Sequence, residues 1–177
     1  FQRTPEYQKV NPGMTVEGFK GIFCLEYFHP LLGRVIGIAF LVPFLWFLFR
    51  RIVRGPLAWQ LSGIFLLGAL QGVLGWYMVR SGLIDNPRVS PFRLTAHLAL
   101  AFLIYAAMLW IALGLLAAEA AAAYAHGARV RRMAWLLTAL VALMVLSGGF
   151  VAGTRAGLAY NTFPLMNGHL VPPELFM

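Results

Sequence analysis

Two of the four histidines, His29 and His97, stand beside or just inside long apolar runs of the chain. Ionisable side chains at such positions are rare in membrane proteins and are functional by default. Two imidazoles without nearby thiolate or carboxylate partners make a poor cage for zinc or copper, and the single cysteine, Cys24, cannot form one. They are, however, what an iron porphyrin needs as axial ligands. For either histidine alone, interfacial packing stays an open alternative.

Glu26 precedes His29 by three residues, so on a continuous helix the two side chains share a face. A carboxylate there is a candidate to orient the imidazole, or to act as a general base at the edge of a macrocycle. The alternative is a carboxylate that favours the start of a helix through the helix dipole.

Haem propionates would need cationic partners, and the forked donors of arginine suit carboxylates. Interfacial anchoring is the alternative reading of each candidate. The candidates are Arg34, Arg80, Arg88 and Arg93. His126 and His169 sit in loops and are expected to be solvated.

The elements that must position these residues are membrane helices. The chain is 60% hydrophobic and only 11% charged, whereas soluble domains average about 25% charged residues. Its net charge of +8 lies in short clusters between apolar runs, which indicates a lipid bilayer as partner and argues against nucleic acid. We predict an all-α protein with an up-and-down four-helix transmembrane bundle. The predicted spans are 31–49, 59–79, 94–118 and 134–153. Residues 1–30 are predicted to form an outer loop and the start of the first span, which carries Glu26 and His29, and residues 154–177 to form a second outer loop.

The distribution of arginine predicts the orientation. Two loops are densely basic and are expected on the inner side of the membrane; they contain Arg50, Arg51 and Arg54, and Arg129, Arg131 and Arg132. Both histidine-bearing helices then run inward, so both imidazoles should lie near the outer boundary. First and third helices are diagonal in such a bundle, and the two rings can face each other across it. Within the second span, the Gly68-x-x-x-Gly72 spacing predicts close helix packing.

Several long segments resemble the haem A synthase family. PEYQKVNPGMTVEGFKGIF followed by EYFH is similar to an outer loop and second helix of that family. GWYMVRSGL at 75–83 resembles the end of its third helix, and RLTAHLALA at 93–101 resembles its fourth. VAGTRAGLAYNTFPLM at 151–166 is similar to the end of its fifth helix and the loop beyond.

The resemblance implies an oxidoreductase that converts a methyl group of haem O into the formyl group of haem A, for use in cytochrome oxidase. It implies an eight-helix architecture made of two similar halves, of which this chain is a front-half fragment. His29 and His97 would be the axial pair for the substrate haem, and Glu26 the acid near the reacting methyl. A haem b is expected in the rear half, so the fragment alone should be inactive.

One departure from the family concerns Pro30, which stands where arginine is usual after the histidine. We expect proline there to disfavour a helical conformation for His29 and to leave the Glu26 carbonyl without its helical donor. The rival functions are an electron-transferring b-type cytochrome without chemistry of its own, and a cofactor-free membrane scaffold or transporter subunit.

The resemblance also implies an electron donor protein and haem O synthase as partners; a homo-oligomer stays open. The expected location is a bacterial inner membrane, with the mitochondrial inner membrane as the alternative.

Overall fold

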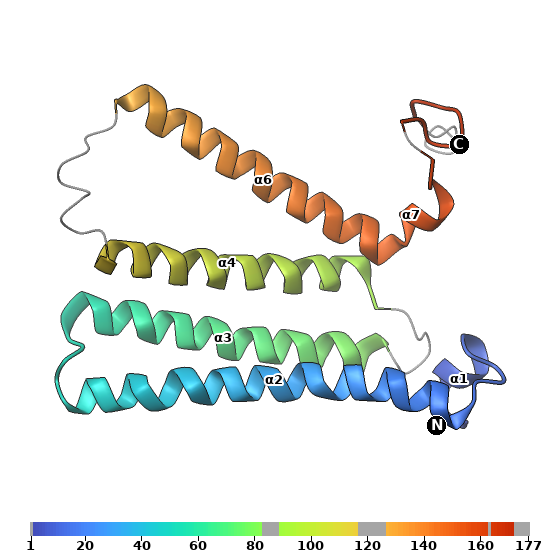
Figure 1. Ribbon diagram of the computed structural model, residues 1–177, viewed down its shortest axis with the longest axis horizontal. Coiled ribbons are helices and arrows are strands. Elements are labelled where there is room, and N and C mark those ends of the chain that lie inside the picture. The colour runs from blue at the N-terminus through green and yellow to red at the C-terminus, as the bar shows by residue number, and fades with distance from the viewer. Residues whose placement is uncertain (1, 83–88, 117–126, 163, 172–177) are drawn as a thin grey trace.

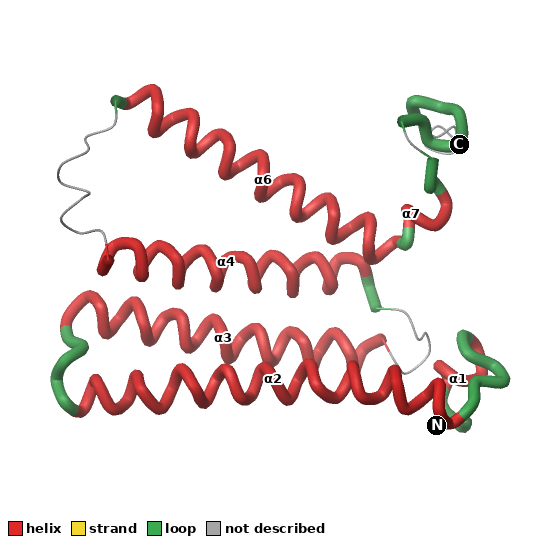
Figure 2. The backbone as a smooth tube through the Cα atoms, viewed as in Figure 1, coloured by secondary structure: helices red, strands yellow, loops and turns green. Residues whose placement is uncertain are grey.

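The computed structural model describes residues 2–82, 89–116, 127–162 and 164–171 (Figure 1). In these residues the regular structure is helical, and Figure 2 shows no strand; a lone bridge joins Met166 and His169. The helices are α1 (Pro5–Lys9), α2 (Val16–Phe49), α3 (Gly55–Gly82), α4 (Pro91–Leu116), α6 (Ala128–Thr154) and α7 (Ala156–Ala159).

Four helices, α2, α3, α4 and α6, are long and apolar enough to cross a membrane, with mean hydropathies from 1.6 to 2.4. This confirms the predicted class, an all-α protein with four transmembrane helices. Their apolar side chains point largely outward, and the buried hydrophobic residues of the described chain are only Phe44, Val53 and Ile64. Lipid, rather than an internal core, must therefore cover most of the apolar surface.

Helix α2 begins much earlier than the predicted start at residue 31. Thr15 caps it, because its hydroxyl accepts a hydrogen bond from the Gly18 backbone N–H at 3.2 Å. At about 1.5 Å per residue its 34 residues measure roughly 51 Å, well beyond the roughly 30 Å hydrocarbon layer. The first turns of α2 therefore project from the membrane. The predicted end of the third span, Ala118, lies outside the described residues.

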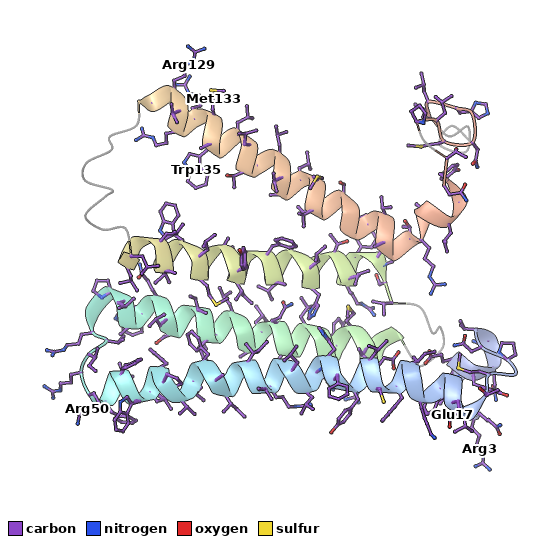
Figure 3. The ribbon with its side chains drawn as sticks, in the orientation of Figure 1. Arg3, Glu17, Arg50, Arg129, Met133 and Trp135 are labelled. Atoms are coloured by element: carbon purple, nitrogen blue, oxygen red, sulfur yellow. The ribbon has the colours of Figure 1, made fainter. Side chains whose placement is uncertain are left out.

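Successive helices alternate in direction, so α2 and α4 begin at the end where α3 and α6 finish (Figure 1). We call this the α1 end and the opposite one the Arg50 end. Arg50 lies at the Arg50 end of α2 and Arg129 at the start of α6, which is on the same side, whereas Arg3 and Glu17 lie at the α1 end (Figure 3). Which side of a membrane these ends face stays a prediction.

Helices pack in chain order: α2 on α3, α3 on α4, and α4 on α6. Among the described residues α2 and α6 do not meet, so the bundle is open between its first and last long helices. Figure 1 shows α6 meeting α4 at the α1 end and diverging from it toward the Arg50 end.

Glycines of α6 allow this meeting. A Cβ added to Gly149 would lie 2.9 Å from the Thr95 hydroxyl oxygen, and one added to Gly153 would lie 2.7 Å from the Pro91 Cα. The rings of Phe92 and Phe150 meet edge to face beside them, with centroids 5.3 Å apart. By contrast, a Cβ at Gly68 or Gly72 would meet no atom within 4 Å. The close packing predicted for the glycines of this span is therefore not seen at Gly68 and Gly72, but it is seen at Gly75, where a Cβ would lie 2.9 Å from the His97 Cε1.

We predict that Gly149→Ala destabilises the protein by about 1–3 kcal/mol, because the added methyl overlaps Thr95. The neighbouring Gly148→Ala is the matched control, since a Cβ there meets nothing within 4 Å. Alanine also favours the helix by up to about 1 kcal/mol at either position, so the control should be neutral or stabilised. Unfolding in detergent measures both; equal effects would contradict the packing.

Candidate functional site

The two candidate histidines lie on parallel helices, each toward the α1 end. His29 comes 20 residues before Phe49, the last residue of α2, and His97 comes six residues after Pro91, the first residue of α4. At about 1.5 Å per residue, His29 lies roughly 30 Å from the Arg50 end of α2, and His97 lies roughly 9 Å from the start of α4. Helices α2 and α4 both pack on α3. The structure therefore places His29 and His97 on two parallel helices that share α3 as a neighbour.

His29 lies within α2, one helical turn after Glu26, and both side chains are exposed. The expectation that Pro30 would make His29 non-helical was wrong, because α2 continues through Pro30 and Pro43. Proline blocks one backbone hydrogen bond, but the rest of a 34-residue helix holds the turn in place. Glu26 and His29 therefore share the helix face that the spacing predicted.

His97 is half-buried between α4 and α3. Its ring lies against Gly75, where an added Cβ would be only 2.9 Å from the imidazole Cε1. The side-chain Nε2 of Gln71 donates a hydrogen bond to the His97 carbonyl at 3.0 Å. The Nδ1 of His97 is buried and has no hydrogen-bond partner among the described residues. In α3, Gly75 thus leaves room for the His97 ring, and Gln71 binds the His97 backbone.

The predicted arginines fall on different sides of the histidine level. Arg93 spans from α4 to the Tyr77 ring on α3, 5.0 Å from its centroid, and Arg80 lies 5.1 Å from the centroid of Trp76. Arg93 comes four residues before His97 on α4, and Arg80 comes five residues after Gly75 on α3. Both arginines therefore lie closer to the α1 end than the contact between His97 and Gly75. Arg34 lies on the other side of His29 and is exposed. Arg88 lies outside the described residues.

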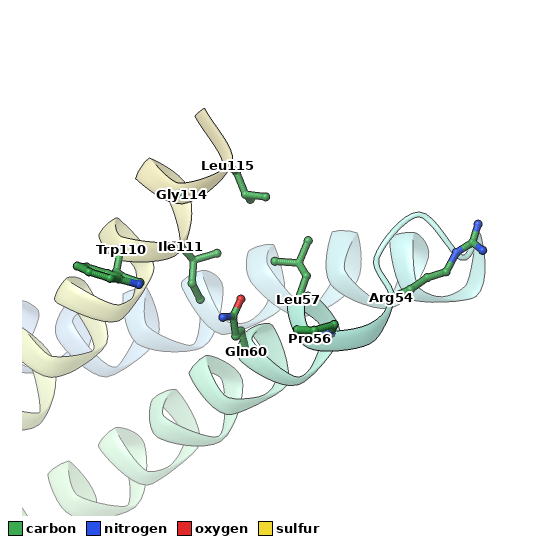
Figure 4. Close-up of a pocket in the computed structure, with 8 residues that line it drawn as sticks. All are labelled: Arg54, Pro56, Leu57, Gln60, Trp110, Ile111, Gly114 and Leu115. Atoms are coloured by element: carbon green, nitrogen blue, oxygen red, sulfur yellow. The ribbon is translucent and has the colours of Figure 1, made fainter. Parts of the chain in front are cut away.

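No group of three or more ligating side chains, of the kind that holds a bare metal ion, occurs in the described part of the chain. A pocket of about 380 Å³ between α3 and α4 lies at the Arg50 end, far from the histidines (Figure 4). Arg54 at its rim uses its Nε to bind the Arg51 carbonyl in the same loop. We therefore place the candidate site at the histidines. The pocket is lined by Arg54, Pro56, Leu57, Gln60, Trp110, Ile111, Gly114 and Leu115.

Comparison with known proteins agrees with the resemblance found in the sequence. The family model described as cytochrome oxidase assembly protein matches residues 1–177, which is the whole chain. The chain belongs to this family. It is thus a multi-pass membrane protein of a family whose curated relatives here are bacterial.

Curated relatives named haem A synthase match the chain closely. The protein of Nitrosospira multiformis is 64% identical over 100% of the chain and 50% of its own length. Those of Nitrosomonas eutropha and Paramagnetospirillum magneticum are each 52% identical, over 100% and 99% of the chain and 50% and 51% of their own lengths. The chain therefore spans about half the length of the relatives it matches. No solved structure was found to match it.

Sequence reasoning missed Gln71 and Gly75 as neighbours of His97. One signal was present: Gln71 is an amide in the middle of the apolar second span, and a polar side chain there needs a partner. No such signal marked Gly75 among the other glycines of its helix, because which of them meets another helix depends on the rotation of α3 against α4.

We predict that Gly75→Ala destabilises the protein because its methyl displaces the His97 ring. In a double-mutant cycle with His97→Ala, removal of the ring should relieve the overlap and give a coupling free energy of about 1–3 kcal/mol. Gly72→Ala, whose methyl meets nothing, should show no coupling to His97→Ala. Unfolding of haem-free preparations excludes a contribution from ligand binding. Additive effects in both cycles would refute the contact.

Proposed function

We propose that this chain is the substrate-haem half of a haem A synthase, an oxidoreductase that converts a methyl group of haem O into a formyl group. One observation carries the proposal: His29 and His97 lie toward the α1 end of two parallel membrane helices that both pack on α3. The names of relatives up to 64% identical support the same reaction. Because the chain spans half of those relatives, activity is proposed for the full-length protein, and the fragment alone is expected to be inactive.

The residues present fit an iron porphyrin. A porphyrin supplies four ligands of its own and needs only two from the protein, which suits a site without a larger ligand cluster among the described residues. When bound, the haem iron supplies the redox chemistry that no side chain provides. His29 and His97 would hold it from two sides.

Glu26 is proposed as the proton acceptor of the reaction. Converting a methyl group into an aldehyde removes hydrogen from carbon, and a carboxylate oxygen is a suitable base for it. Glu26 lies on the same helix as His29 and one turn closer to the α1 end, so it would reach the edge of a macrocycle held by that histidine. The Glu26 carboxylate is exposed, and it forms no ion pair with another described residue that would compete for it.

Arg80 and Arg93 are proposed as partners of the haem propionates. Both lie on the α1 side of the histidines, and both rest on aromatic rings that hold the guanidinium in place. Arg34 lies on the Arg50 side of His29. It would therefore bind neither propionate of a haem whose propionates point toward the α1 end. A haem b in the rear half, an electron donor protein and haem O synthase complete the proposal, with a bacterial inner membrane as the location.

We predict that Glu26→Gln in the full-length protein leaves haem bound but lowers haem A production by at least about a hundredfold, the lower range for loss of a general base. Glu17→Gln is the matched control, since Glu17 lies on the same helix and forms an exposed ion pair with Lys20 at 2.8 Å. Pigment extraction and chromatography measure the product. Undiminished production in Glu26→Gln would show that Glu26 is not the proton acceptor of the reaction.

We further predict that His29→Ala and His97→Ala each abolish the absorption and paramagnetic resonance signals of a haem with two histidine ligands at this site. His169→Ala should leave them unchanged, because His169 lies in the terminal turn beyond α7, paired through its backbone with Met166. Persistence of both signals in either of the first two variants would show that this pair is not the ligand set. Absence of any haem absorption from the unsubstituted protein would leave a cofactor-free scaffold as the remaining function.

A further inference from the structure

Gln71 is held in one orientation by its contact with α4. Its Nε2 donates to the His97 carbonyl at 3.0 Å across 26 residues of chain. The other end of the same amide, Oε1, is buried and has no hydrogen-bond partner among the described residues. Gln71 thus has an unused hydrogen-bond acceptor, Oε1, on the same side chain whose Nε2 already binds the His97 carbonyl.

His97 presents the matching donor. Its Nδ1 is buried and also lacks a partner in the described part of the chain. A neutral imidazole carries a proton on only one nitrogen, and a bare Nε2 for a metal requires that proton to sit on Nδ1. A buried donor and a buried acceptor that both stay unpaired have lost their hydrogen bonds to water without compensation. One hydrogen bond between them, or one bridging water, satisfies both.

Thr95 is the third buried polar group without a partner here, but it does not compete for this role. Its hydroxyl lies against Gly149 of α6, whereas the His97 ring lies against Gly75 of α3. Thr95 and His97 are two residues apart on α4, so their side chains point to different neighbouring helices. Gln71 is therefore the acceptor that shares a helix interface with His97.

We propose that Gln71 is a positioning residue for the haem ligand His97: its Oε1 accepts the Nδ1–H of His97, directly or through one water, while its Nε2 holds the His97 backbone. This rests on the proposed function, because His97 must be a ligand for its tautomer to matter. The bond fixes the tautomer with Nε2 facing the iron. It also makes that nitrogen more basic, which favours ferric over ferrous iron and lowers the reduction potential.

The test is a redox titration of the full-length protein, followed by optical absorption. The component that disappears in His97→Ala belongs to this site. For that component, Gln71→Leu removes the acceptor and should raise the ferrous-to-ferric ratio at a given potential by about tenfold, equal to about 59 mV for one electron. Gln71→Glu keeps an oxygen acceptor, so its potential should be at or below that of the unsubstituted protein.

Gln60→Leu is the matched control, because it makes the same substitution on α3 beside the pocket at the Arg50 end. Its potential should not move. An unmoved potential in Gln71→Leu, or an equal upward shift in Gln71→Leu and Gln71→Glu, overturns the role of Gln71 while leaving the haem site intact. If no component depends on His97, the proposed function itself fails, and the two failures are thereby distinguished.

Discussion

The contact between the His97 ring and Gly75 sets the geometry on which the rest of the site depends. In lipid there is no hydrophobic drive between helices, so they associate through close packing and a few hydrogen bonds. At Gly75 the absence of a side chain lets an imidazole enter the interface between α3 and α4. One turn away, Gln71 bonds the His97 backbone and fixes the register of the two helices. A larger residue at position 75 would move the ring and the interface together.

Helix α4 is held on two sides at this same height. Gly75 of α3 receives His97, and Gly149 of α6 receives Thr95, two residues earlier on α4. The α1 ends of these helices are therefore drawn together, whereas α6 separates from α4 toward the Arg50 end (Figure 1). Rigid packing is thus concentrated where the candidate ligands lie. A site that must hold a large planar group benefits from supports of this kind, because ligand orientation depends on the residues behind the ligand.

Hydropathy was enough to predict four helices that are long and apolar enough to cross a membrane, since these follow from the length of apolar runs. It failed at the start of α2, where a polar turn capped by Thr15 extends the helix beyond the apolar part. It also overstated the effect of Pro30, because a single missing backbone bond is small beside a 34-residue helix. The contacts of Gln71 and Gly75 depend on helix rotation, which apolar runs do not record.

The heights of the charged residues restrict which part of a bound haem could react. Glu26 lies three residues to the α1 side of His29, about 4.5 Å along the axis, and Arg93 lies four residues to the same side of His97, about 6 Å. If Arg80 and Arg93 bind the propionates, Glu26 lies at the propionate edge of the macrocycle. A carboxylate acts only on hydrogens within contact distance. Under the proposed function, the methyl group served by Glu26 is therefore one adjacent to a propionate, and methyl groups on the far edge are out of its reach.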